Sequence, residues 1–300
     1  MNKVDYVIPY VNCDDQSWID LYSRTVGAEF PKSRYRDNGT LKYQLRGIEK
    51  NMPWINRVYL IVQSKSQIPH WLNVQNPRLR IVTHDEFIPR EYLPAFKSSL
   101  IELHIHRIDD LSENFILSND DMVPIKEQNI ESYFRRDRPV QVMFENDKML
   151  SPNGDSMAFK LYKMMILEQF FTHNENFKGI KHFHLLLPYK KSFWKEMIDK
   201  YKYTFSVSFC ENRYRGFMDL NHWLISDLQI LSGVSIIDNT LNTEGYIKID
   251  DFTCLEDINS VVKNSDTLCM NDWVENNEKN LDIIETTLSG LLPRKSAFEM

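Results

Sequence analysis

An acidic pair at the end of an apolar segment is the clearest sign of chemistry in this sequence. Residues 115–117, Phe-Ile-Leu, are typical of a buried strand, and Asn119, Asp120 and Asp121 follow after a single serine. Adjacent carboxylates repel each other, so they favour either water or a divalent cation. Strand ends that face a crevice are also where open α/β sheets bind ligands. The local pattern supports two interpretations about equally: a Mg²⁺ or Mn²⁺ site made by Asp120 and Asp121, or a solvated turn.

The composition is that of a globular chain. Its 300 residues are 42% hydrophobic, which suits one large α/β domain or two smaller ones, and its formal net charge is −6. The negative balance argues against a protein built for nucleic-acid backbones, so we expect no nucleic-acid partner, while a local basic pocket for phosphate stays compatible with it. The four cysteines are scattered and are expected to be reduced thiols without a chemical role.

The N-terminal residues lack the apolar core of a signal peptide, and no stretch is long and apolar enough to span a bilayer. We therefore expect a cytoplasmic protein, attached to the inner face of the plasma membrane only through partners if at all.

Strand-like and helix-like segments alternate in the first half of the chain. Strands are predicted at residues 6–8, 58–62, 79–82, 115–119 and 140–144, and helices at about 41–50 and 96–108. This alternation is typical of a largely parallel, Rossmann-like sheet. Helical spacing then dominates residues 160–171, 189–201 and 217–231, and the polar stretch 238–280 gives no clear prediction. We expect one domain over residues 1–300, with an α/β half of about residues 1–145 and a mainly helical half of about residues 146–300 that completes the cleft.

Segments along nearly the whole chain match, in order, the blocks of a known family. They lie at residues 5–12 (DYVIPYVN), 34–46 (RYRDNGTLKYQLR), 53–54, 68–72 (IPHWL), 83–84, 101–107 (IELHIHR), 119–121, 184–192 (HLLLPYKKS), 213–221, 268–272 and 292–299. Together they resemble the stealth family of sugar-phosphate transferases, which includes bacterial capsular polysaccharide phosphotransferases and the catalytic subunit of the lysosomal N-acetylglucosamine-1-phosphotransferase. The first block departs from the family, because Pro9-Tyr10 stands where Thr-Trp is usual, and the role of that loop stays open.

The resemblance implies a Rossmann-like, glycosyltransferase-A-like mixed sheet with a helical C-terminal portion. It also implies transfer of a hexose-1-phosphate from a nucleotide diphosphate sugar, with a UDP-sugar as first candidate, to a hydroxyl of an acceptor glycan. Nucleoside monophosphate would leave, and a phosphodiester of a capsular or other surface polysaccharide would form. A lipid-linked acceptor and peripheral association with the membrane-bound polysaccharide assembly machinery are compatible with this role.

Two other functions stay open. A metal-dependent glycosyltransferase would use the same acidic pair but release nucleoside diphosphate. A carbohydrate-binding protein without catalysis would need aromatic platforms and no metal site, and the clustered Asp, Arg and His residues speak against it.

Positive and polar side chains within the matching blocks are predicted to bind the donor. Arg36, Arg46 and Arg215 offer planar donors for phosphate oxygens, and Arg215 is preferred over Arg213 as a catalytic residue together with Asp120. Without the resemblance, Arg46 would be interpreted as the exposed face of its helix. Arg36 lies in a polar turn at residues 34–39, where the pattern favours a plain loop and a ligand-binding loop about equally. The other residues predicted to bind substrate are Asn12, Asp37, Asn38, Glu102, His106, Asn119, Asp219 and Asn221.

A histidine is predicted to supply the general base, because the acceptor hydroxyl must lose a proton as it attacks phosphorus. His184 is the candidate, since it begins a matching block, and His182 is the rival. For His104 and His106 a hydrogen-bonded supporting role is favoured over that of a base. A zinc site at this His-x-His is discounted, because no suitable cysteine or third histidine lies nearby in the sequence.

Overall fold

The structure is organised around a five-stranded sheet. The computed structural model describes residues 2–27, 31, 35–144, 180–210, 219–250, 253–272 and 278–300. The sheet has the order β3-β2-β1-β4-β8, with β1 (Val4–Pro9), β2 (Val58–Val62), β3 (Leu79–Thr83), β4 (Asn114–Leu117) and β8 (Leu187–Lys190). The first four strands are parallel, and β8 is antiparallel to β4. The predicted α/β fold with a Rossmann-like, mixed sheet is confirmed.

The strand order creates a crevice at one edge of this sheet. From the central strand β1 the chain moves outward to β2 and β3, and it then returns to the other side of β1 with β4. Ligands of open α/β sheets bind where the strand order reverses in this way, at the carboxyl ends of the strands. All five residues of β2 are buried, as expected for a parallel strand covered on both faces.

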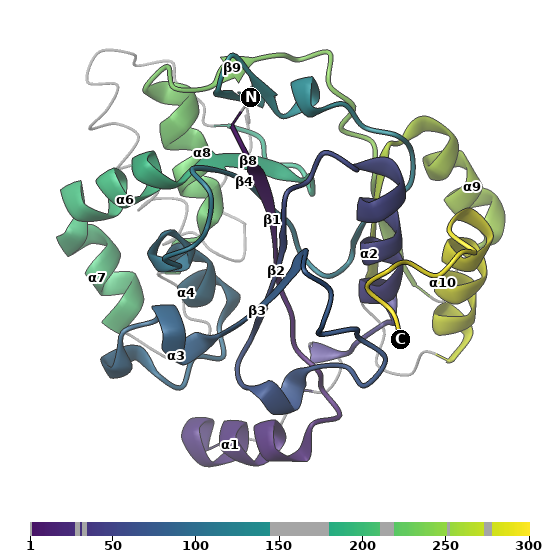
Figure 1. The fold of residues 1–300 in the computed structure, drawn as a ribbon, viewed down its shortest axis with the longest axis horizontal. Coiled ribbons are helices and arrows are strands. Elements are labelled where there is room, and N and C mark those ends of the chain that lie inside the picture. The colour runs from purple at the N-terminus through teal and green to yellow at the C-terminus, as the bar shows by residue number, and fades with distance from the viewer. Residues whose placement is uncertain are drawn as a thin grey trace.

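Helices cover both faces of the sheet (Figure 1). On one side lie α3 (His84–Phe87), α4 (Ser98–Leu103), α6 (Lys191–Lys200), α7 (Lys202–Cys210) and α8 (His222–Leu231). On the other lie α2 (Thr40–Asn51), α9 (Leu255–Asn264) and α10 (Glu278–Leu291), while α1 (Gln16–Val26) lies beyond the carboxyl end of β1. Short 3₁₀ turns occur at Lys65–Gln67, Arg90–Tyr92, Ile105–Arg107 and Ile130–Ser132.

Two helix predictions need correction. The helix expected at residues 96–108 is only α4, followed by a 3₁₀ turn, because residue 97 is extended and His104 already departs from helical hydrogen bonding. The helix expected at residues 189–201 begins after β8 instead. Of the helix predicted at residues 217–231, residues 222–231 form α8 and residues 219–221 precede it without helical structure; the helix predicted at residues 160–171 lies outside the described residues.

The C-terminal portion carries helices, as predicted, and also strands that the sequence pattern did not indicate. Besides β8, these are β9 (Ile236–Ile237), β10 (Tyr246–Ile249) and β11 (Thr267–Asp272). They form two small sheets with strands of the first half: β10-β11-β5 with β5 (Met122–Pro124), and β6-β7-β9 with β6 (Phe134–Arg135) and β7 (Arg138–Gln141). Strand β7 replaces the strand predicted at residues 140–144. The division into two halves within one domain stays a prediction.

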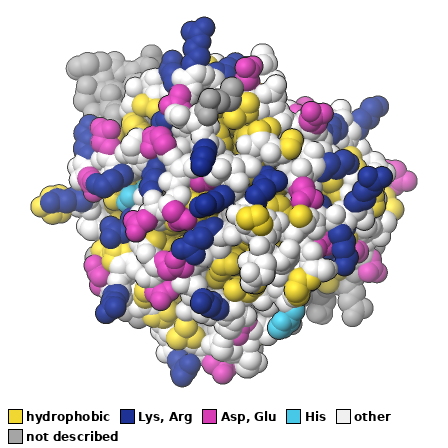
Figure 2. Space-filling view, viewed as in Figure 1, with side chains coloured by type: hydrophobic (Ala, Val, Ile, Leu, Met, Phe, Trp, Pro, Cys, Tyr) yellow, Lys and Arg dark blue, Asp and Glu magenta, His cyan; other side chains and the backbone are white. Residues whose placement is uncertain are grey.

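The surface is mixed in charge. On the face shown in Figure 2, basic and acidic side chains are interspersed, with apolar side chains between them. No helix in the described ranges is long and apolar enough to cross a membrane.

Candidate active site

A cleft of about 310 Å³ opens at the carboxyl edge of the main sheet. Four of its lining residues lie at or just after the ends of the parallel strands: Pro9 for β1, Gln63 for β2, His84 for β3 and Asn119 for β4. The remaining lining residues are Tyr10, Val11, Trp18, Tyr35, Arg36, Asn38, Thr40, Ala95, Phe96, Ser98, Ile101, Glu102, Asp120, Asp121, Met270 and Asn271. The cleft therefore lies where the sheet topology predicts a ligand site.

The acidic pair lines this cleft. Burial, and then the neighbouring charges of Asp121 and Asp37, raise the pKa of Asp120 well above its ordinary value. Burial raises the pKa of Asp121 to about 6, although the Cys269 thiol, whose Sγ lies 3.5 Å from Asp121 Oδ2, favours the ionised form. Two neighbouring carboxylates whose negative charges are stabilised by so few protein groups favour binding of a cation.

Buried polar atoms without a partner gather at the same place. In the described part of the chain, Asn38 Oδ1, His84 Nδ1 and Asp121 Oδ1 are buried without a hydrogen-bond partner, and all three residues line the cleft. Burial lowers the pKa of His84 to about 3, so this imidazole is neutral at physiological pH. Because an unpaired buried polar atom costs free energy, these atoms indicate a ligand-binding site.

The residue types fit a hard divalent cation. Carboxylate and amide oxygens are the donors that Mg²⁺ and Mn²⁺ prefer, and Asp120, Asp121 and Asn38 supply them. The described residues contain no cluster of three His, Cys, Asp or Glu side chains that could hold a metal alone. Oxygens of a bound substrate would have to complete the coordination, which is usual for Mg²⁺.

The loop before α2 forms one wall of the cleft. Asp37 accepts hydrogen bonds from Tyr10 Oη at 2.6 Å and from the Gly39 amide at 2.7 Å, which fixes the loop between Arg36 and Asn38. Gly39 has a φ of 70°, a left-handed conformation that suits glycine. Tyr10, whose position departs from the family pattern, thus helps to hold this loop.

Aromatic side chains form another wall. The ring of Trp18 lies 5.1 Å from that of Tyr35 and 5.6 Å from that of Phe96, both in edge-to-face geometry. Such an apolar wall beside charged groups is typical of small-molecule sites. It was not predicted from the sequence, where the aromatic residues are too widely spaced to indicate a common surface.

His182 and His184 lie outside this cleft, in a strip of stacked rings. The His182 ring stacks on Trp223 at 4.8 Å, and the His184 ring lies 5.9 Å from Trp223 and stacks on Tyr246 at 4.5 Å. Tyr246 pairs with Cys269 across β10 and β11, and Cys269 contacts Asp121. His184 therefore packs on β10, the strand that pairs with the one carrying Cys269.

The two histidines differ in their partners. His182 Nε2 lies 2.9 Å from Oδ1 of Asp227, a fully buried carboxylate that sequence analysis did not single out. A base oriented by a buried carboxylate is a recurrent catalytic arrangement. Burial lowers the pKa of His184, which favours its neutral form.

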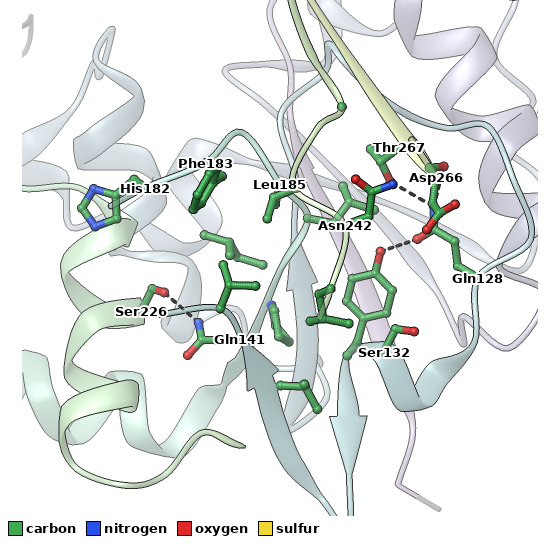
Figure 3. Close-up of a pocket in the computed structure, with 18 of the residues that line it drawn as sticks. Gln128, Ser132, Gln141, His182, Phe183, Leu185, Ser226, Asn242, Asp266 and Thr267 are labelled. Atoms are coloured by element: carbon green, nitrogen blue, oxygen red, sulfur yellow. Dashed lines mark hydrogen bonds between the residues drawn. The ribbon is translucent and has the colours of Figure 1, made fainter. Parts of the chain in front are cut away.

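His182 lines a second cavity of about 310 Å³ (Figure 3). The polar groups of this cavity bond to one another: Gln141 Nε2 donates to Ser226 Oγ at 2.7 Å, and Gln128 Nε2 donates to Thr267 Oγ1 at 2.9 Å. None of the partnerless buried atoms in the described ranges belongs to its lining. Because partnerless buried polar atoms line the first cleft and not this cavity, the first cleft is the better candidate for the site of a charged ligand.

The structure corrects the prediction for Arg46. Its Nε and Nη2 donate to the two carboxylate oxygens of Glu299 at 2.8 and 2.7 Å, and its Nη1 donates to Leu292 O at 2.9 Å. Only 11% of the Arg46 side chain is exposed. Arg46 therefore ties α2 to the C-terminal residues and does not line the cleft.

His106 is a second correction. It is buried, its Nδ1 lies 3.0 Å from Leu103 O, and burial lowers its pKa to about 3. His104 is similar, with Nδ1 2.8 Å from Leu100 O and a pKa of about 4. Both are hydrogen-bonded interior residues, and neither lines the cleft.

Of the other predicted residues, Arg36, Asn38, Glu102, Asn119, Asp120 and Asp121 line the cleft together. Asp219 and Asn221 do not: Asp219 Oδ1 accepts from buried Lys97 Nζ at 2.6 Å, and Asn221 caps α8. Asn12 lies beside the cleft-lining Val11, with its Oδ1 bonded to the Asp14 amide at 3.0 Å. Arg213 and Arg215 lie outside the described residues.

Comparisons with known proteins agree with the order of the sequence blocks. A family model described as Stealth protein CR2, conserved region 2, matches residues 34–142. The chain is 30% identical over 341 residues to the capsular polysaccharide phosphotransferase WcwK of Streptococcus pneumoniae, an alignment that covers 100% of this chain and 98% of that protein. It is 29% identical over 338 residues to the receptor polysaccharide phosphotransferase WefC of Streptococcus oralis, with 100% of both covered.

Among solved structures, the galactosyltransferase LgtC in complex with donor and acceptor sugar analogues aligns over 98% of both chains, with 11% identity and a TM-score of 0.46. A likeness at this score supports no conclusion about fold or activity. The full-length relatives and the matching family model, by contrast, show that this chain belongs to the stealth family.

Proposed function

We propose that this protein transfers a sugar-1-phosphate from a nucleotide diphosphate sugar to a hydroxyl of an acceptor glycan during synthesis of a capsular or other surface polysaccharide. Its family and the phosphotransferase names of its full-length relatives support an enzyme of the phosphotransferase class. The donor, with a UDP-sugar as first candidate, and the released nucleoside monophosphate are the finer parts of the proposal.

The observation that carries the proposal is the set of charges in the cleft. Asp120 and Asp121 meet there with partnerless oxygens of Asp121 and Asn38, and Arg36 lines the same cleft. A pyrophosphate with its cation suits this arrangement, because the cation would satisfy the carboxylates and Arg36 could pair with phosphate oxygens.

Asp120, Asp121 and Asn38 are the residues that would hold Mg²⁺ or Mn²⁺. The cation would neutralise charge on the donor phosphates as the leaving nucleotide departs. Asp37 and Tyr10 would keep the wall that carries Arg36 and Asn38 in place through their mutual hydrogen bond. The aromatic rings of Trp18, Tyr35 and Phe96 would exclude water from one side of the donor.

His184 is the proposed base for the acceptor hydroxyl. Two observations support it: burial favours its neutral imidazole, and its ring stacks on Tyr246 of β10, the strand paired with the one that carries Cys269 beside Asp121. His182 is the second candidate, because Asp227 would orient its ring and stabilise the imidazolium after proton transfer. The acceptor glycan, lipid-linked or free, would then lie along this strip of rings.

The test is the identity of the released nucleotide. Purified protein is incubated with candidate nucleotide sugars, Mg²⁺ and an acceptor glycan, and the nucleotides are separated by chromatography. Nucleoside monophosphate formed in proportion to product supports the proposal. Nucleoside diphosphate would identify an ordinary glycosyltransferase, and saturable glycan binding without turnover of any donor would identify a carbohydrate-binding protein.

A further inference from the structure

One face of α2 lies along the acidic turn and the strand that follows it. Four residues of α2 share this face at helical spacing: Thr40, Gln44, Gly47 and Asn51. Each of them contacts the chain between residues 119 and 124. The contacts therefore follow the whole length of the helix.

The first two contacts hold the backbone of the acidic turn itself. Thr40 Oγ1 donates to Asp120 O at 2.6 Å. Gln44 Nε2 donates to Asn119 O at 2.9 Å and to Ser118 Oγ at 2.7 Å. Both α2 side chains are buried, so water does not compete for these carbonyls.

The next two contacts fix the distance between α2 and β5. A Cβ on Gly47 would lie 2.3 Å from Pro124 O, so only glycine allows this approach. Asn51 Nδ2 donates to the same Pro124 carbonyl at 2.8 Å. The helix therefore lies directly against the strand that leaves the acidic turn.

Residues on the opposite side of α2 bond to α10 and to the C-terminal residues. Tyr43 Oη donates to Glu285 of α10 at 2.5 Å, and Arg46 pairs with Glu299 at 2.7 Å. Glu49 Oε1 accepts from the Ala297 amide at 3.0 Å. With both faces fixed, α2 offers the acidic turn a rigid support.

We propose that α2 positions the acidic pair for cation binding, with Thr40 and Gln44 as its positioning residues. This inference rests on the proposed function, because it assumes a divalent cation between the carboxylates and the donor. Neither residue needs to touch the cation. They hold the carbonyls of Asn119 and Asp120, and so set the direction in which the two carboxylates leave the backbone. Groups that orient metal ligands typically change metal affinity or activity about 10- to 100-fold when they are replaced.

The test compares variants that lose the hydrogen bonds of one side chain to the acidic turn. Thr40→Val keeps the shape and removes the hydroxyl, Thr40→Ser restores it, and Gln44→Leu removes the second support. Thr25→Val on α1 is the matched control, since Thr25 Oγ1 also donates to a backbone carbonyl, that of Leu21, at 2.7 Å. Mn²⁺ affinity is measured by electron paramagnetic resonance of free Mn²⁺ with unlabelled donor present, and Tm is measured in parallel.

Thr40→Val and Gln44→Leu are expected to weaken Mn²⁺ binding at least about tenfold, with Thr40→Ser and Thr25→Val within about twofold of wild type. Equal Mn²⁺ affinity in wild type, Thr40→Val and Gln44→Leu would overturn the inference and leave the proposed function intact. A loss in Thr25→Val as large as that in Thr40→Val, with matching drops in Tm, would also overturn it. A wild-type protein that turns over donor but binds no Mn²⁺ would contradict the metal site and the inference together.

Discussion

Asp120 and Asp121 line the cleft together, and burial raises the pKa of both. Asp121→Asn keeps the shape of the side chain but removes a charge that the cation needs. We expect its turnover at saturating Mg²⁺ to fall roughly 10²-fold or more, since a catalytic cation contributes several kcal/mol to the transition state. Excess chelator should likewise abolish turnover of the wild type, and Mg²⁺ or Mn²⁺ should restore it.

The control for this prediction is Asp109→Asn, which removes an exposed carboxylate. It should leave turnover unchanged. Full turnover of the wild type in excess chelator, or full turnover of Asp121→Asn, would show that the reaction does not depend on a cation held by this acidic pair.

The two histidines can be separated by the same kind of comparison. If His184 is the base, His184→Ala should lower turnover per folded molecule about 10²- to 10⁴-fold with little change in donor KM. His182→Ala should then have a much smaller effect. If turnover collapses in His182→Ala and stays near normal in His184→Ala, the base is His182, oriented by Asp227. Near-normal turnover in both would exclude a histidine of this strip as the base.

At the scale of elements, the two arginines predicted to bind the donor belong to different structures. Arg36 lines the cleft, whereas Arg46 holds the C-terminal residues to α2. Arg36→Ala should raise the donor KM about tenfold or more, because it loses a charge-assisted phosphate contact. Arg46→Ala should leave that KM within about twofold and lower the free energy of unfolding by about 3 kcal/mol, since it leaves the buried Glu299 carboxylate without its cationic partner.

Urea unfolding and donor titrations of both variants check this prediction. A large rise in donor KM for Arg46→Ala at unchanged stability would show that the sequence-based prediction for Arg46 was right after all.

Arg46 also shows what the sequence can and cannot predict. The spacing of Leu41, Leu45 and Ile48 predicts α2 correctly, because an amphipathic helix needs only local apolar periodicity. The direction of Arg46 depends on Glu299, which is 253 positions away, and no local pattern contains that contact. A distant contact also lies beside the start of α4. Lys97, the residue before this helix, is extended and donates to Asp219, which is 122 positions away.

The acidic site could be predicted because its evidence is local. An apolar strand followed by Asn-Asp-Asp places the carboxylates at a strand end in any parallel sheet, and the structure has them there. The side chains that hydrogen-bond to the backbone of the acidic turn could not be predicted in the same way. Thr40 and Gln44 are ordinary helix residues until the helix is seen against residues 119–124.

At the scale of the whole molecule, buried neutral histidines should make the fold sensitive to acid. Burial lowers the pKa of His104 to about 4 and of His106 to about 3, against 6.5 for an ordinary histidine. At these two histidines the unfolded chain therefore binds more protons below pH 6.5 than the folded protein does, so their contribution to stability falls as the pH falls. Each histidine should lower the free energy of unfolding by about 2 kcal/mol between pH 7 and pH 5.

Replacing one of them should flatten this dependence. His106→Gln should reduce the loss of unfolding free energy between pH 7 and pH 5 by about 2 kcal/mol, whatever its stability at pH 7. His70→Gln, at an exposed position, should leave the loss unchanged. Equal pH dependence in wild type and His106→Gln, from urea unfolding at both pH values, would contradict the burial argument.

The central claim is that the bond broken lies between the two phosphorus atoms of the donor pyrophosphate, so that the sugar moves with its phosphate. The direct measurement uses a nucleotide diphosphate sugar with ³H in the sugar and ³²P in the sugar-proximal phosphate. After incubation with acceptor glycan and Mg²⁺, the account predicts that both labels enter the glycan in the ratio they had in the donor. Transfer of ³H alone, with ³²P retained in released nucleoside diphosphate, would contradict it.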